Sequence, residues 1–326
     1  MTKKLKLYSL FHVNPAIAQR HSNLSSAAGN PIDIYLNCGR LLAASCRHFD
    51  IEYAIVTNQA DYLSERLTFL GGGIKIIAFD LNRTVPRGIS FYSAHFKLDL
   101  PRGFGEGVFG ERVGLVDLDA VLVKPLPLNY ASVGDNELLV YDISEIERAS
   151  YGDDVIAKSL TAIGGHVASA PYWFGGEFIL GSANSFQMLS LEIDRLWPMY
   201  LKRHSELHHQ GDEMVVSAAL KHLEKSGVSL IDVGQSSRLG TEPMIARWWS
   251  SRTLGRQIPL STAARASILH LPADKPFLAR MADSEFDPAK FLRSYRRHVQ
   301  LKLIPRKLIN PILNFSSQKR YYAPDI

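Results

Sequence analysis

Short apolar runs alternate with amphipathic stretches over the first 80 residues of the chain. Residues 7–13, 53–57 and 74–79 are rich in Val, Ile, Leu and aromatic residues, which predicts three strands. Between them, residues 32–49 and 60–70 have apolar positions at helical spacing. Strands and helices in this order predict an α/β fold with a mostly parallel, doubly wound sheet, whose ligands bind beyond the carboxyl ends of the strands.

The most informative stretch is the apolar run 113–123, which is interrupted by Asp117 and Asp119. Its Val and Leu content predicts a fourth, buried strand with an apolar continuation. Side chains alternate along a strand with a period of two, so the two carboxylates are expected on the same side. Buried acids without partners are costly, so this pair needs a cation: a metal ion, a Lys or Arg, or solvent at the rim.

The rest of the main domain continues the alternation less regularly. Residues 142–170 show no clear period, and residues 238–267 have a loop-like composition. Gly175 and Gly176 would allow another group to approach the backbone closely. Further strands are predicted at 138–141, 172–181 and 228–233, a short helix within 89–102, and longer helices at 183–203 and 215–224.

The hydrophobic content, the two cysteines and the lengths of the apolar stretches indicate the cellular compartment that we expect for the protein. The 326 residues are 46% hydrophobic, which is ample for a large core, and the only two cysteines, Cys38 and Cys46, are expected to be reduced. The basic N-terminus precedes too short an apolar stretch for a signal peptide, and there is no 18-residue apolar span. We therefore expect a cytoplasmic protein without a membrane-spanning helix.

The net charge of +5 is unevenly distributed. Residues 286–326 contain nine Lys or Arg and two Asp, a net charge of +7, so residues 1–285 carry about −2. Asp287-Pro288 predicts a helix start, followed by apolar residues on one face and basic residues on the rest. Such helices lie on anionic membrane surfaces, although a merely solvated helix has the same pattern. No basic groove in the main domain supports a nucleic-acid partner.

Several short motifs together resemble a known family. A basic residue on a helix, Lys97, precedes the strand that carries Asp117-Leu-Asp119, and Lys124-Pro-Leu126 follows that strand. This arrangement resembles the nucleotide-sugar glycosyltransferases of the A-type fold, and most closely family 8, which includes bacterial lipopolysaccharide galactosyl- and glucosyltransferases. His270 to Pro276 matches the family's late His-x-x-Gly-x-x-Lys-Pro loosely, without the Gly, and Gly175-Gly-Glu177 replaces an expected Asn-x-Gly.

The resemblance implies a donor site. Asp117 and Asp119, with His270, would hold Mn²⁺ or Mg²⁺, and mixed oxygen and imidazole ligands favour Mn²⁺. Lys97 and Lys275 would contact the phosphates of a nucleotide diphosphate sugar. Asp117 would also take part in donor binding, through the metal ion that it holds. We also expect the donor to be bound by two residues at the carboxyl end of the first strand, His12 and Asn14.

Three acids are candidates for catalysis. Asp212 and Glu213 lie at a predicted helix start, where a carboxylate could contact the transferred sugar or act as a base, but where acids also serve as ordinary caps. Glu177 is a weaker candidate that follows two glycines. Trp248 and Trp249 could form a lid or an acceptor platform, and core packing of at least one explains them equally well.

The function expected from the sequence is a metal-dependent, retaining hexosyltransferase. It would move a hexose from a UDP-sugar to a lipopolysaccharide or another glycan or lipid-linked acceptor. Residues 1–285 would form the catalytic domain, and residues 286–326 a basic tail on the inner, cytoplasmic face of the cell membrane, with no nucleic acid involved. Two alternatives stay open: a nucleotidyltransferase of sugar phosphates, and a non-catalytic membrane-associated scaffold with a degenerate donor site.

Overall fold

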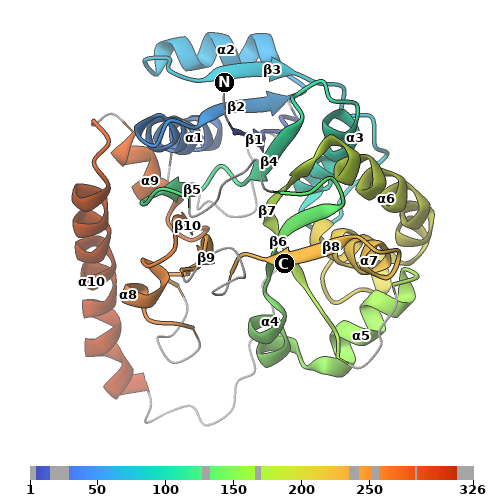
Figure 1. Cartoon of the computed structure of the whole chain (residues 1–326). Coiled ribbons are helices and arrows are strands. Elements are labelled where there is room, and N and C mark those ends of the chain that lie inside the picture. Colours follow the sequence, from blue (N-terminus) through green and yellow to red (C-terminus); the bar gives the residue numbers. More distant parts are fainter. Residues whose placement is uncertain are drawn as a thin grey trace.

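A central sheet of seven strands runs through the molecule in the order β3-β2-β1-β4-β7-β6-β8 (Figure 1). The computed structural model describes residues 5–14, 29–126, 133–165, 170–234, 242–251, 257–282 and 285–313, the last of these with side chains as far as residue 302.

The first half of the sheet is parallel throughout, as the sequence predicts. Strands β2 and β4 both pair with β1, and β3 pairs with β2. The chain therefore winds away from β1 on one side and returns on the other, and the carboxyl ends of β1 and β4 border the crevice where such sheets bind ligands. The elements are β1 (Lys6–Leu10), α1 (Pro31–His48), β2 (Glu52–Thr57), α2 (Ala60–Phe69), β3 (Lys75–Ala78), η2 (Tyr92–Asp99), α3 (Leu100–Gly105) and β4 (Arg112–Val116).

The second half of the sheet is mixed. Strand β7 is antiparallel to both β4 and β6, while β6 and β8 are parallel, so the expected mostly parallel α/β sheet is confirmed. The segment without a clear period forms two short helices, α4 and α5. The elements are β6 (Glu137–Asp142), α4 (Ser144–Tyr151), α5 (Asp153–Ala162), β7 (Phe174–Ser182), α6 (Ala183–Arg203), η4 (His204–Glu206), α7 (Asp212–Lys225) and β8 (Ser229–Asp232).

The apolar run 113–123 is two strands, so the expectation of one continuous strand was wrong. The chain turns at residues 117–119, and β5 (Ala120–Leu122) joins a separate sheet of order β5-β10-β9, with β9 (Ile245–Arg247) and β10 (Ile268–His270). The turn is closed by a hydrogen bond from the Ala120 amide to the Asp117 carbonyl. The turn therefore lies at the junction of the two sheets.

Alternation along β2 shows how the sheet is covered on both faces. Ile55 belongs to the same buried cluster as Leu36 of α1 and Leu63 of α2. Its neighbour Val56 belongs instead to the large cluster that contains Phe104 of α3. Successive side chains of a strand point to opposite faces, so helices on both sides of the sheet bury them.

The C-terminal helix α10 (Pro288–Leu313) runs along the outer edge of the molecule, beside the small sheet (Figure 1). The Asp287-Pro288 start is confirmed, and the helix continues through Pro305 and Pro311. Its apolar residues Phe291, Tyr295 and Val299 are 1%, 0% and 5% exposed and pack into a core cluster of the main domain. The face that was expected to contact a membrane is therefore covered by protein over this part of the helix.

A buried carboxylate, that of Asp274, attaches α10 to the domain. Asp274 precedes α9 (Lys275–Met281) and accepts hydrogen bonds from Tyr295 Oη at 2.8 Å and Ser250 Oγ at 2.8 Å. Lys302 forms an ion pair with the same carboxylate. The cationic and hydroxyl donors outweigh the effect of burial and lower the pKa of Asp274.

Two further expectations concern cysteines and membrane spans. Cys38 and Cys46 are both buried and free. Among the described residues, no helix has the length and apolarity needed to cross a membrane.

Candidate active site

One cavity of about 350 Å³ opens where β1 and β4 end. It gathers most of the site residues that the sequence predicts, although they come from five separate segments. Those that line it are His12, Lys97, Asp117, Asp119, Asp212, Glu213, His270 and Lys275.

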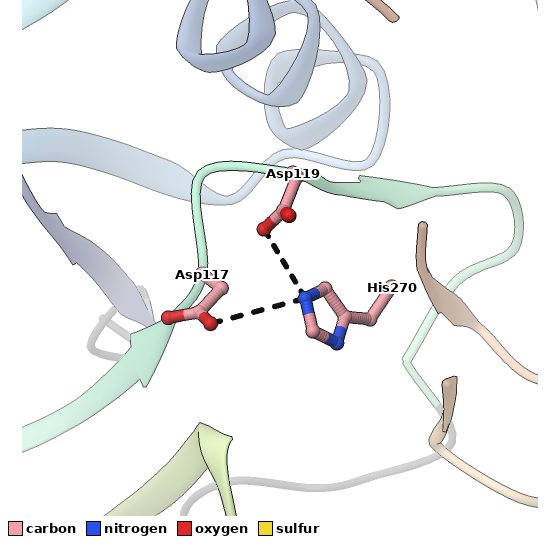
Figure 2. A group of neighbouring side chains, drawn as sticks. All are labelled: Asp117, Asp119 and His270. Atoms are coloured by element: carbon pink, nitrogen blue, oxygen red, sulfur yellow. Dashed lines mark hydrogen bonds and ion pairs between the residues drawn. The ribbon is translucent and has the colours of Figure 1, made fainter. Parts of the chain in front are cut away.

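Asp117, Asp119 and His270 meet at the junction of the two sheets (Figure 2). One ligand atom from each lies within 4.8 Å of the others. His270 Nε2 is 3.1 Å from Asp119 Oδ1 and 3.8 Å from Asp117 Oδ2. The pairing of β10 with β5 sets this geometry, because it places His270 opposite Ala120, the residue after Asp119. Two carboxylates and an imidazole around one point are a suitable ligand set for Mn²⁺ or Mg²⁺.

Each of the two aspartates also contacts one lysine. Lys97 Nζ lies 2.7 Å from Asp117 Oδ1, and Lys275 Nζ lies 2.6 Å from Asp119 Oδ2. Burial opposes the charge of Asp119, but Lys275 and His270 outweigh it and hold its pKa well below the ordinary value. For Asp117 burial is the larger effect, and its pKa is raised. The lysines are thus placed where anionic phosphates bound beside the aspartates would meet them.

Glu177 lies behind this cluster and does not line the cavity. Its carboxylate is 3.3 Å from His270 Nδ1, on the opposite side of the ring from the aspartates. Burial disfavours a charged imidazole, but Asp119 and Glu177 outweigh it and raise the pKa of His270 to about 9. A carboxylate at one ring nitrogen fixes which nitrogen is presented to a metal at the other. Glu177 is therefore positioned to orient His270 and not to react with substrate.

Arg247 is the centre of a buried ion-pair network. Its guanidinium donates to Glu177 Oε1 from Nε at 2.6 Å, and to Glu213 Oε1 from Nη2 at 2.6 Å. Nη1 lies 3.5 Å from Glu147 Oε1. Burial alone would lower the pKa of Arg247, but the surrounding carboxylates raise it well above its ordinary value. One cation thus holds three carboxylates from three elements, α4, β7 and α7.

The two acids at the start of α7 have different surroundings. Glu213 accepts hydrogen bonds from Trp173 Nε1 at 2.7 Å and from the Gly176 amide at 3.2 Å, in addition to Arg247. Asp212 is 5% exposed, lines the cavity, and among the described residues only Lys97 lies within ion-pair distance, at 3.7 Å. Glu213 is therefore committed to the framework, whereas Asp212 faces the cavity.

The glycines of β7 leave the space that this arrangement needs. A Cβ atom at Gly176 would lie 2.8 Å from Asp212 Oδ2, and one at Gly175 would lie 2.1 Å from Glu177 Oε2. Any side chain at either position would displace these carboxylates. This is the close approach that the sequence predicts at these glycines.

The charge of the cavity favours a divalent cation. Among the residues that the structure describes, six carboxylates border it or lie directly behind it, and three Lys or Arg side chains, Lys97, Arg247 and Lys275, face them. The remaining excess of three negative charges is larger than a singly protonated His270 could neutralise. The six are Asp117, Asp119, Glu147, Glu177, Asp212 and Glu213.

The remaining predicted residues fall in different places. His12 stacks on Phe96 with ring centroids 3.9 Å apart, and Ser93 Oγ lies 3.2 Å from its Nδ1. Asn14 does not line the cavity. Trp248 is a core residue at 1% exposure, while Trp249 lines the cavity; the nearby Arg252 and Arg256 lie outside the described residues.

Three acidic, basic or histidine side chains that line the cavity, those of Glu147, His209 and Arg247, were not among the predicted site residues. Glu147 lies in the segment without a clear period, so no pattern pointed to it. Arg247 stood in a loop-like stretch as one of several arginines, and His209 was interpreted as part of a loop. An Arg directly before two tryptophans was the only available signal, and it does not identify a partner.

The Arg247 network can be tested by stability alone. Arg247→Met should lower the free energy of unfolding by about 3–5 kcal/mol, because it leaves buried carboxylates without their cation. The matched control is Arg265→Met, whose ion pair with Glu242 is exposed and screened by solvent, so that its loss should change the free energy of unfolding much less. Urea unfolding measures both variants. Equal losses in the two would contradict the assigned role of Arg247.

No protein-family model matches the sequence, and no curated protein matches it. Several solved structures with a low level of similarity to the chain are glycosyltransferases by name. The bifunctional glycosyltransferase WbbM has 12% identity and a TM-score of 0.48 over 83% of this chain, which spans 46% of that protein. The galactosyltransferase LgtC has 13% identity and a TM-score of 0.47, and the match covers 88% of this chain and 99% of LgtC. Mouse xyloside xylosyltransferase 1 has 12% identity and a TM-score of 0.46, and the match covers 82% of this chain and 97% of that protein. At these levels of identity the similarity concerns the fold alone.

Proposed function

We propose that the protein is a metal-dependent glycosyltransferase that moves a hexose from a UDP-sugar to a glycan or lipid-linked acceptor, such as lipopolysaccharide. The observation that carries the proposal is the proximity of Asp117, Asp119 and His270 to two lysines and to Asp212 in one negatively charged cavity. Transfer from a nucleotide diphosphate sugar needs charge stabilisation at the phosphates and a carboxylate at the sugar.

Each group has a part in the proposed reaction. Asp117, Asp119 and His270 would hold Mn²⁺ or Mg²⁺, which as a bound Lewis acid stabilises negative charge on a departing diphosphate. Lys97 and Lys275 would neutralise phosphate oxygens. His12, which is stacked on Phe96, would contact the nucleoside at the end of β1, and Asn14 is proposed to act beside it.

Asp212 is the proposed sugar-facing carboxylate. At the first position of α7 its charge is favoured by the helix dipole, and its oxygens are not occupied by hydrogen bonds from the framework. It could accept hydrogen bonds from sugar hydroxyls, stabilise an oxocarbenium-like centre, or take the acceptor's proton. Retention of the anomeric configuration is included in the proposal on the resemblance alone.

The nucleotidyltransferase alternative would place a glycine-rich basic loop after β1. Most of the corresponding segment, residues 15–28, lies outside the described residues. A scaffold with a degenerate site would keep the fold and lose turnover. Metal-dependent hydrolysis of a UDP-sugar to UDP and free sugar would distinguish the glycosyltransferase from both alternatives, and cleavage that requires pyrophosphate would identify the nucleotidyltransferase.

The metal assignment predicts that Asp117→Asn and Asp119→Asn each lower Mn²⁺-dependent UDP-hexose hydrolysis by about a hundredfold or more. Each change removes a charged ligand and leaves the side-chain volume unchanged. Asp61→Asn, an exposed acid on α2, is the control and should keep full activity. Wild-type rates in the Asn variants would rule out the ligand set.

The two acids of α7 should respond differently to neutralisation. Asp212→Asn should lower kcat by about a hundredfold or more while stability stays near that of the wild type. Glu213→Gln should instead lower stability, because Arg247 loses a charged partner. Steady-state kinetics and urea unfolding on the same preparations separate the two effects. An Asp212→Asn enzyme with normal kcat would remove the assignment.

A further part of the proposal is that exposed basic residues of α10 attach the protein to the anionic, cytoplasmic face of a membrane by electrostatic attraction. Lys290, Arg293, Arg296 and Arg297 of α10 are exposed, whereas the apolar residues between them are buried in the domain. Basic residues near an anionic surface contribute about 1 kcal/mol each, and salt screens the attraction.

Binding to vesicles of mixed neutral and anionic phospholipid tests this surface. Changing Lys290, Arg293 and Arg297 to Gln should weaken sedimentation with the vesicles by about a hundredfold. The control replaces Lys158, Lys202 and Lys225, which are exposed on α5, α6 and α7, and so removes the same charge elsewhere. Equal weakening by both triple variants would show that no particular surface is used.

A further inference from the structure

Four aromatic rings form a continuous arc along one wall of the cavity. Phe91 and His209 have ring centroids 4.9 Å apart, His209 and Trp173 5.0 Å, and Trp173 and Tyr151 5.7 Å. All four residues line the cavity, and they come from four different segments of the chain. Folding thus assembles the arc at this wall, and no sequence motif predicts it.

The two ends of the arc are open to solvent. Phe91 is 41% exposed and Tyr151 is 46% exposed, whereas Trp173 between them is 2% exposed. Tyr151 stacks on Trp173 with an angle of 23° between the planes, so a buried ring supports the exposed one. Large apolar side chains held partly in water beside a cavity are typical of a surface that a ligand covers.

Phe91 also has a strained backbone. Its φ of 58° lies in the left-handed region, and among the non-glycine residues described only Asp50 shares a positive φ. A bulky residue in that conformation is costly, and such strain persists where the surroundings hold it for a purpose. Here it directs an exposed ring to the cavity.

The arc is connected to the acids of α7. Trp173 Nε1 donates to Glu213 Oε2, and His209 Nε2 lies 3.9 Å from the same oxygen. Asp212 is the preceding residue, and it is linked through Lys97 to Asp117. A series of contacts therefore runs from the metal-ligand set, past the proposed sugar-facing acid, to the aromatic wall.

We propose that Phe91 and Tyr151 form the platform for the sugar ring of the acceptor, an inference that rests on the proposed function. A hexopyranose has an apolar face of C–H groups that packs on an aromatic ring, and a rim of hydroxyls that needs hydrogen-bond acceptors such as Asp212. Among the described residues, the lysines that would suit a phosphate, Lys97 and Lys275, lie beside Asp117 and Asp119. The platform therefore selects a neutral sugar next to the transfer site.

The probes are methyl α- and β-glucopyranoside and methyl α- and β-galactopyranoside, with binding measured by saturation-transfer NMR on the full chain. Phe91→Asn removes the ring and keeps a residue that tolerates positive φ, and Tyr151→Ala removes the other ring. Phe91→Tyr and Tyr151→Phe retain the rings. Phe69→Asn is the control, because this ring is 77% exposed on α2 and does not line the cavity.

The two ring-removing variants should bind the best glycoside about fivefold to tenfold more weakly, while the ring-retaining variants and Phe69→Asn stay within about twofold of the wild type. UDP binding in the presence of Mn²⁺ should be unchanged in all five. Wild-type affinity after removal of either ring, or no glycoside binding by the wild type, would overturn the platform. Glycoside binding that depends on the rings, in a protein that neither binds nor hydrolyses UDP-sugars, would overturn the proposed function and leave the platform standing.

Discussion

The excess of carboxylates over cations in one cavity is the constraint on which the rest of the site depends. Buried charge of one sign is tolerated only when cations and hydrogen bonds compensate it, and in the described part of the chain three Lys or Arg side chains are shared among six acids. Arg247 compensates three of the acids, Glu147, Glu177 and Glu213. The two lysines compensate those nearest the opening. The remaining negative charge in the cavity strongly favours the binding of one more cation.

The fold creates this place by ending two sheets at one point. Strand β4 stops at Val116, the chain turns through Asp117 and Asp119, and β5 continues in the small sheet. Backbone bonds hold the turn from both sides, from the Asp117 amide to the Glu177 carbonyl and from the Leu271 amide to the Asp119 carbonyl. Because α10 is bound through Asp274, next to Lys275, the C-terminal helix also supports this wall of the site.

The periodicity of apolar residues and the spacing of acids in the sequence predict the elements and pairs that are formed by neighbouring residues. The alternating apolar runs predict the parallel half of the sheet, and the spacing of Asp117 and Asp119 identifies the central pair of acids. Their meeting with His270, 151 residues further on, follows from a motif resemblance and not from periodicity. The roles of Asp212 and Glu213 could not be separated by sequence, because the difference is Arg247, which reaches Glu213 across the fold. The apolar face of α10 has the same pattern on a membrane and on a protein core, and only the structure shows that the core covers it.

The central claim, that Asp117, Asp119 and His270 hold a divalent cation beside a nucleotide diphosphate, is tested most directly by electron paramagnetic resonance of Mn²⁺ added with UDP. We expect one bound Mn²⁺ per chain with a hyperfine coupling from one imidazole nitrogen, and we expect that coupling to disappear in His270→Gln. Mn²⁺ that stays free in solution with the wild-type protein, or a nitrogen coupling that persists without His270, would contradict the account.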